Sequence, residues 1–246
     1  MSALIVVIGF IIAPPVLLEL CGAPIMARFW ISLERRRARL ITRRAHMGDL
    51  QMPYLDSGSG QETLVLIHGF GADKDHFTRV AALLRHRMRI VIPDLPGFGD
   101  ASRPAGANYR VMDQVERLHC FLITLGLDRV HIGGSSMGGF IAAQYASTYP
   151  ELVHSLWLLN AAGCTRATDN EVFDTYRKTG DIPLLVRHDN DFSNLLSMCV
   201  SKPPVLPKSL RHLLTQRAMA DAELHGRILR DLNDDSTMLD TRGTQI

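Results

Sequence analysis

Two adjacent serines, Ser135 and Ser136, lie in a glycine-rich stretch of the kind that surrounds an activated nucleophile. The motif G-x-S-x-G places its serine on a sharp turn from strand to helix, where side chains two residues before and after would clash. A motif centred on Ser135 has Met137 at the second glycine position. A motif centred on Ser136 has Gly134 and Gly138 at the two positions. The spacing therefore predicts Ser136 as the nucleophile of an acyl-transfer reaction.

A second glycine motif, IHGFG at residues 67–71, can supply donors for a negative oxygen. In acyl transfer through a serine, two backbone N–H groups stabilise the oxyanion of the tetrahedral intermediate. One belongs to the residue after the nucleophile, here Met137, and the other to a loop after an earlier strand. We expect the second donor to be the N–H of Phe70, in the loop that begins with His68 and Gly69.

A serine nucleophile also needs a base and an acid that orients this base, and both follow the serine in this motif order. Histidines follow Ser136 at positions 154, 188, 212 and 225. We interpret all four as surface or packing residues, since none comes at the end of a predicted strand. Asn160 does end a strand, but its amide carries no charge. We therefore expect the acid and the histidine beyond residue 246.

Short apolar runs alternate with helical segments along the middle of the chain. The predicted strands lie in residues 63–69, 89–99, 129–135 and 152–163, and the strand in 89–99 runs into a Pro/Gly turn. The predicted helices are residues 72–86, 108–127 and 137–150. This alternation predicts a parallel sheet covered by helices on both faces, in which ligands bind at the carboxyl ends of the strands. The motifs that fall there are His68-Gly69, Asp94, Gly134–Gly138 and Asn160.

The alternation stops after Gly163. Residues 164–230 read as helical, with SKPPVLPKSL in their middle and no run of the buried-strand type. We predict an inserted helical cap at 164–230, between an α/β core at 46–163 and a return segment at 231–246. Residues 1–45 are predicted to form a hydrophobic anchor with a basic flank.

The amino-terminal segment is apolar and carries no charge before Glu19. A span of roughly 20 apolar residues can cross a bilayer. Seven arginines follow between Arg28 and Arg44, which predicts a cytoplasmic catalytic domain behind a membrane anchor. A cleaved signal peptide that exports the protein is the main alternative. A basic-flanked helix that lies on the membrane surface is another.

Composition excludes some other classes of function. The formal net charge is +2, which gives no reason to expect nucleic-acid binding. The cysteines form no CxxC pair and no spacing typical of metal ligands, so no metal site is expected. They stand at positions 21, 120, 164 and 199.

Four stretches together resemble a known family. They are LVLIHGFGADKDHFTRVAALL, IVIPDLPGFGDASRPAGANYR, VHIGGSSMGGFIAAQYASTYPELVHSLWLLNAAG and KPPVLPKSL. The chain is similar over about residues 50 to 230 to α/β-hydrolase-fold lipases. The nearest branch is the monoacylglycerol-lipase-like group with an amino-terminal membrane anchor, together with related bacterial lipases.

The resemblance implies a serine esterase or lipase that acts on short or single-chain acyl glycerols without a cofactor. It implies Ser136 as nucleophile, with Phe70 and Met137 as backbone oxyanion donors. It also implies that residues 164–230 are a cap whose apolar side guides the acyl chain. The acid and histidine of the family follow two further core strands, so the chain resembles a carboxy-terminally truncated member.

Two alternatives stay open from the sequence. A carbon–carbon-bond hydrolase of the same fold also uses a serine. A hydrolase-like domain that binds a ligand without turnover is consistent with the missing acid and histidine. Haloalkane dehalogenases and epoxide hydrolases need an aspartate at position 136, so the serine argues against both.

Overall fold

The computed structural model describes residues 22–163, 175, 178–179, 182–203 and 205–233. The chain divides into two compact units, one of residues 1–33 with 183–222 and one of residues 34–182 with 223–246. Residues 1–21, which hold most of the predicted membrane anchor, lie outside the described residues. Within the described part of the chain, none of the helices has the length and apolar character that a membrane crossing requires.

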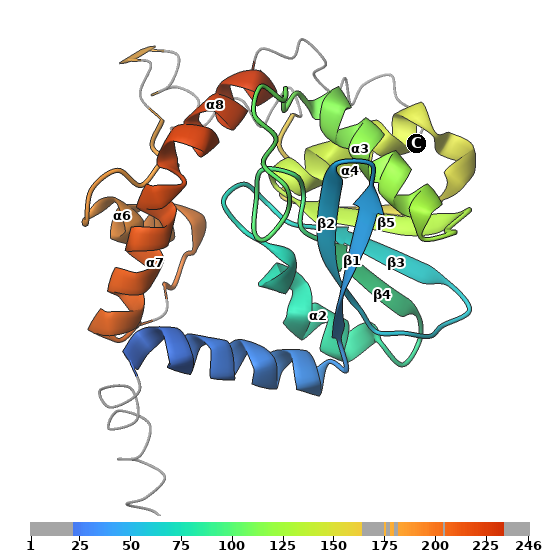
Figure 1. Cartoon of the computed structure of the whole chain (residues 1–246), viewed down its shortest axis with the longest axis horizontal. Helices are drawn as coiled ribbons and strands as arrows, with labels where there is room; N and C mark the ends of the chain where they lie inside the picture. The colour runs from blue at the N-terminus through green and yellow to red at the C-terminus, as the bar shows by residue number, and fades with distance from the viewer. Residues whose placement is uncertain (1–21, 164–174, 176–177, 180–181, 204, 234–246) are drawn as a thin grey trace, which may run out of the picture. The chain divides into compact units, whose positions relative to one another are not determined.

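A six-stranded sheet forms the centre of the larger unit, with the strand order β1-β2-β4-β3-β5-β6 (Figure 1). The strands are β1 Ile41–Met47, β2 Leu50–Asp56, β3 Thr63–Ile67, β4 Arg89–Pro93, β5 Val130–Ser135 and β6 Val153–Leu159. β3 pairs in parallel with β4 and β5, and β5 pairs in parallel with β6. β1 and β2 add an antiparallel hairpin at the β4 edge. Four parallel strands therefore end at the same edge of the sheet.

Helices cover both faces of this sheet, as the alternation predicts. Helices α3 (Val111–Thr124) and α4 (Met137–Thr148) pack on one face, in a core that includes Val65, Ile67 and Val91. The short helix η1 (Lys74–Phe77) and α2 (Thr78–Leu84) pack on the other, against the alternate residues of the same strands. Each strand of the centre is apolar on both sides because both sides are buried.

The antiparallel hairpin is a feature that the sequence patterns did not indicate. β1 begins at Ile41, so the core starts before residue 46, where we predicted its boundary. Arg43 and Arg44 belong to this strand and not to the flank of an anchor. Ala45 is the buried residue of β1, and so the strand lacks the apolar alternation that would reveal it. Pro53 within β2 further disguises the pairing, since proline is rare inside sheets.

The remaining elements are helical. In the smaller unit lie α6 (Asp191–Cys199) and α7 (Lys208–Ala220), and residues 22–37 form a helix that begins in this unit. α8 (Ala222–Asn233) packs on the core through Ile228, and Asp231 accepts a hydrogen bond from the Tyr109 amide at 2.9 Å. No strand occurs among the described residues of 164–230, but the end of this range belongs to the core unit.

Candidate active site

Ser136 is the single residue that joins β5 to α4, because β5 ends at Ser135 and α4 begins at Met137. Its φ of 53° and ψ of −118° lie in a region that residues with a Cβ atom rarely adopt. Ser136 is exposed, whereas Ser135 is half-buried on the strand. The structure thus places Ser136, and not its neighbour, on a strained and accessible turn.

Close backbone packing explains the two glycines around this turn. A Cβ atom on Gly134 would overlap the carbonyl group of Gly138. A Cβ atom on Gly138 would overlap the carbonyl oxygens of Ile67 and His68, at the end of β3. Any larger residue at either position would push α4 away from the sheet, so the turn requires both glycines.

Hydrogen bonds from the segment after β6 hold the Ser136 backbone. The Ser136 amide donates to the Leu159 carbonyl at 3.1 Å. The Ser136 carbonyl accepts from the Ala162 amide at 3.0 Å and from the Phe140 amide at 3.1 Å. Asn160 lies between these contacts and has a φ of 51°, which turns the chain back toward α4. The conformation of the turn therefore depends on β6 as well as on β5 and α4.

The loop after β3 approaches Ser136 closely. A Cβ atom on Gly69 would lie 3.3 Å from the Ser135 carbonyl oxygen and 3.5 Å from the Ser136 Cβ. Phe70 follows on this loop, and the Met137 amide is the first of α4, where helix geometry provides no intrahelical acceptor. The two predicted oxyanion donors thus lie on the two segments that meet at Ser136. Their role as an oxyanion hole stays a prediction.

His68 is fully buried and braces this loop. The Leu95 amide donates to its Nε2 at 3.1 Å, and its Nδ1 lies 2.9 Å from the Gly69 carbonyl oxygen. Since an amide only donates and a carbonyl only accepts, the ring is neutral with its proton on Nδ1. Burial also lowers the pKa of His68. The lone pair of this ring is already used, so His68 orients the loop and does not serve as a base.

A buried ion pair fixes the same loop to the segment after β4. Lys74 Nζ donates to Asp94 at 2.6 Å and to Asp100 at 2.7 Å, and the Lys74 amide donates to Asp94 at 2.7 Å. The side chains of Lys74 and Asp94 are 2% and 0% exposed. Burial opposes the charge of Lys74, but the two carboxylates outweigh it and raise the pKa of Lys74. Asp94 is thus a structural anchor at the strand end where we expected a functional residue.

The described residues provide no base for Ser136. No histidine or carboxylate among them forms a hydrogen bond with its hydroxyl. His154 is the second residue of β6 and stacks on His131 at 5.2 Å. His225, on α8, is 9% exposed and packs against Phe70 with ring centroids 5.4 Å apart. Nor do the described residues contain a cluster of three or more side chains suited to a metal ion.

Lys74 and Asp100 are members of the site that sequence reasoning missed. Lys74 lies between two aspartates in the predicted helix 72–86, where a lysine is usually solvated. Its burial results from the fold of two loops that are distant in sequence. No local pattern in the chain marks such a contact.

The chain is similar to known proteins. The family profile described as the alpha/beta hydrolase fold matches residues 62–218, which include Ser136 and the loop 68–71. Lipase 1 of Psychrobacter immobilis is 40% identical over 188 residues, covering 76% of this chain and 59% of that protein. Monoacylglycerol lipase ABHD6 of Homo sapiens is 31% identical over 175 residues, covering 67% of this chain and 52% of that protein. The chain thus spans between half and three fifths of the length of these relatives.

Solved structures extend the similarity to three dimensions. The crystal structure of a membrane phospholipase A, described as a bacterial virulence factor, matches with a TM-score of 0.83 and 37% sequence identity. The match covers 95% of this chain and 76% of that chain.

Proposed function

Because this chain belongs to the alpha/beta hydrolase fold family, we propose that it is the part of a carboxylic-ester hydrolase that carries the nucleophile, Ser136. The observation that carries this proposal is the strained backbone of Ser136 between β5 and α4. Such strain persists only where the surrounding structure imposes it, and it concentrates at functional sites. The two flanking glycines and the three backbone hydrogen bonds of Ser136 impose it here.

The chemistry proceeds through an acyl-enzyme. Ser136 Oγ attacks the ester carbonyl carbon, and its proton passes to a histidine that we place outside the described residues. The N–H groups of Phe70 and Met137 stabilise the oxyanion that forms, and its collapse expels the alcohol. Water then attacks the acyl-enzyme and releases the acid, so the reaction needs no cofactor. Loss of one oxyanion donor typically lowers the rate by about 10²–10³-fold.

We propose lipid esters as the substrate class. The similar proteins are named as lipases, a monoacylglycerol lipase and a membrane phospholipase. The predicted cap at 164–230 would contact the acyl chain. Release of fatty acid from a monoacylglycerol distinguishes this reaction from carbon–carbon-bond hydrolysis on the same fold.

We further propose that the amino-terminal segment holds the protein at a membrane. The helix over residues 22–37 presents exposed apolar side chains, with Phe29 57% and Trp30 48% exposed. Tryptophan is enriched where membranes meet water. An uncleaved anchor with a cytoplasmic catalytic domain fits the arginines that follow. Reporter fusions at each end of the protein test this topology against export by a signal peptide.

Covalent labelling tests the assignment of the nucleophile. The protein, expressed from its whole reading frame, should react with a fluorophosphonate probe and release fatty acid from a monoacylglycerol. Ser136→Ala should reduce labelling to background, since no other hydroxyl occupies the turn. Ser135→Ala is the matched control and should retain labelling. Labelling that persists in Ser136→Ala, or that only Ser135→Ala removes, would refute the assignment.

A further inference from the structure

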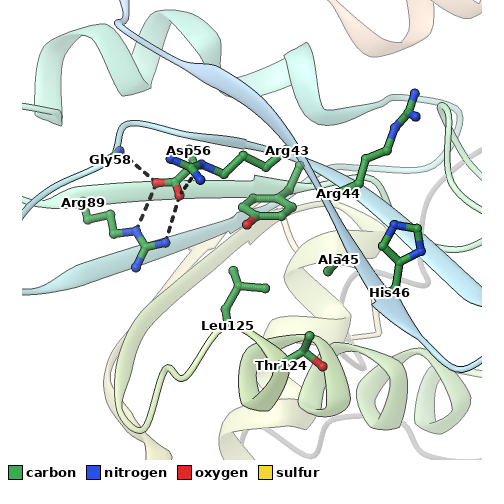
Figure 2. A pocket seen from close by; sticks show the side chains of 10 residues that line it. Arg43, Arg44, Ala45, His46, Asp56, Gly58, Arg89, Thr124 and Leu125 are labelled. Atoms are coloured by element: carbon green, nitrogen blue, oxygen red, sulfur yellow. Dashed lines mark hydrogen bonds and ion pairs between the residues drawn. The ribbon is translucent and has the colours of Figure 1, made fainter.

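A polar cavity lies at the end of the sheet opposite to Ser136. It has a volume of about 400 Å³ and is lined by residues of β1 and β2, by Gly58, by Arg89 and by the last turn of α3 (Figure 2). Arg89 begins β4, whereas Ser136 follows the end of β5, and both strands run parallel to β3. The cavity is therefore separate from the proposed catalytic site.

Two arginines converge on one buried carboxylate in this cavity. Arg89 donates to both oxygens of Asp56, at 3.0 and 2.8 Å, and Arg43 Nε lies 3.4 Å from the same group. The Gly58 amide also donates to Asp56, at 2.9 Å. Figure 2 shows all of these contacts on the one carboxylate. Asp56 thus neutralises one of two guanidinium groups, and the cavity keeps an excess positive charge.

The accessible parts of these side chains are donors. Arg43 is 51% exposed and Arg89 is 23% exposed, whereas Asp56 is 2% exposed. Each arginine keeps N–H groups that Asp56 does not bind, because a guanidinium has five. Arg44 and His46 also line the cavity. The side chain of Arg44 extends away from Asp56 in Figure 2, as the alternation along β1 requires.

Tyr54 adds a neutral donor to the same cavity. Its side chain lines the cavity although the residue is only 7% exposed, and the described residues provide no hydrogen-bond partner for its hydroxyl. Burial and the nearby Asp56 raise the pKa of Tyr54, so the hydroxyl keeps its proton. The hydroxyl can therefore donate to a ligand that enters the cavity.

We propose that this cavity binds a phosphate group, which accepts hydrogen bonds from Arg43, Arg89 and the Tyr54 hydroxyl. Guanidinium groups match phosphate oxygens in shape and charge, and both arginines keep donors that Asp56 does not use. The volume exceeds that of a phosphate ion, which leaves room for the group esterified to it. The phosphate belongs either to a lipid headgroup or to a soluble phosphate.

Inorganic phosphate is the first probe, titrated into the full chain by calorimetry. Arg43→Gln and Tyr54→Phe should each weaken binding, Arg43→Gln by about tenfold, as expected for one charged hydrogen bond. Both variants leave the Arg89–Asp56 pair in place, and unfolding midpoints check that they fold. Arg79→Gln, at an exposed position on α2, removes the same charge at a residue that does not line the cavity and should bind as the wild type does.

Vesicles distinguish the two sources of the phosphate. Flotation with phosphatidylcholine vesicles is compared with flotation after phosphatidic acid is added to them. If phosphatidic acid increases flotation of the wild type and of Arg79→Gln but not of Arg43→Gln, the site binds lipid headgroups. Binding of inorganic phosphate without such a gain assigns it to soluble phosphates. Equal losses in Arg43→Gln and Arg79→Gln, or no binding in either assay, overturn the proposal. Neither assay depends on ester hydrolysis, so failure here leaves the proposed function unaffected.

Discussion

Ser136 holds a backbone conformation that glycine adopts freely and serine does not. Replacing it with glycine removes the Cβ atom that causes the strain. We predict that Ser136→Gly increases the free energy of unfolding by about 1 kcal/mol, even though it abolishes the hydroxyl. Urea denaturation followed by circular dichroism measures this change.

Ser135→Gly provides the comparison, because Ser135 lies on β5 with ordinary strand geometry. Glycine there adds flexibility to the unfolded chain and should lower stability by about 0.5–1 kcal/mol. We therefore expect the two glycine substitutions to change the free energy of unfolding in opposite directions. A loss of stability in both would show that the Ser136 turn carries no strain.

The buried ring of His68 predicts a pH dependence of stability. Burial lowers the pKa of His68. The folded chain then binds fewer protons than the unfolded chain below the ordinary histidine pKa of about 6.5. The stability that the neutral His68 ring contributes should therefore be fully present above this pH. It should be lost as the pH falls below it. Urea midpoints at about pH 7.5 and 5.5 bracket the transition.

His68→Asn should show a smaller fall between these two pH values, together with a lower stability at the higher one, since the Leu95 amide loses its acceptor. His86→Asn, at an exposed position, should keep the wild-type dependence. The lowered pKa values of Asp56 and Asp100 act only at more acidic pH, near the ordinary carboxylate range of about 4. An unchanged pH dependence in His68→Asn would contradict the neutral, buried ring.

At the scale of elements, Lys74 connects η1 to the segment after β4. Lys74→Met leaves the Asp94 carboxylate buried without its partner. Breaking a buried pair in this way typically costs about 3–5 kcal/mol. We expect a loss of this size in the free energy of unfolding, measured by urea denaturation.

The double variant Lys74→Met, Asp94→Asn should recover part of this loss, because no unpaired buried charge remains. Lys202→Met, at an exposed position, should change stability by less than about 0.5 kcal/mol. A loss in the double variant that equals the sum of the two single losses would show that the pair does not interact.

The parallel part of the fold was readable from the sequence, because its strands are buried on both faces. β3, β4 and β5 begin within one residue of their predicted starts, and helix α4 begins where we predicted it. Continuous apolar runs between turn residues are a strong signal. β4 ends at Pro93, and the chain after it forms the predicted Pro/Gly turn, in a loop that Asp94 anchors.

The hairpin β1–β2 and the Lys74 contacts could not be predicted from the sequence, and the physical reason is the same for both. β1 is held by backbone pairing with β2 and buries little apolar surface of its own. The Lys74–Asp94 pair joins positions 20 residues apart through the fold. Both depend on neighbours that are distant in sequence. The position of Ser136 between β5 and α4 could be predicted because the steric requirement for its glycines is local, and its role as nucleophile stays a prediction.

At the scale of the whole molecule, the proposed membrane contact predicts a change in tryptophan fluorescence. The chain has two tryptophans, Trp30 on the first described helix and Trp157 on β6. Adding phosphatidylcholine vesicles should shift the emission to shorter wavelengths, because Trp30 would leave water for the interface. The shift should persist in Trp157→Phe and disappear in Trp30→Phe. A shift that depends on Trp157 instead would contradict contact through this helix.

The hydrogen bonds of the Ser136 backbone have a consequence for local unfolding. Its amide and carbonyl bind residues on either side of the turn after β6, so the nucleophile keeps its geometry only while that strand end is ordered. The free energy of local unfolding of the Ser136 turn therefore cannot exceed the free energy of local unfolding of the carboxyl end of β6. Amide hydrogen exchange should show Ser136 and Ala162 exchanging together, as one cooperative unit. Any substitution that loosens the end of β6 would then lower the fraction of molecules able to react, without touching the serine.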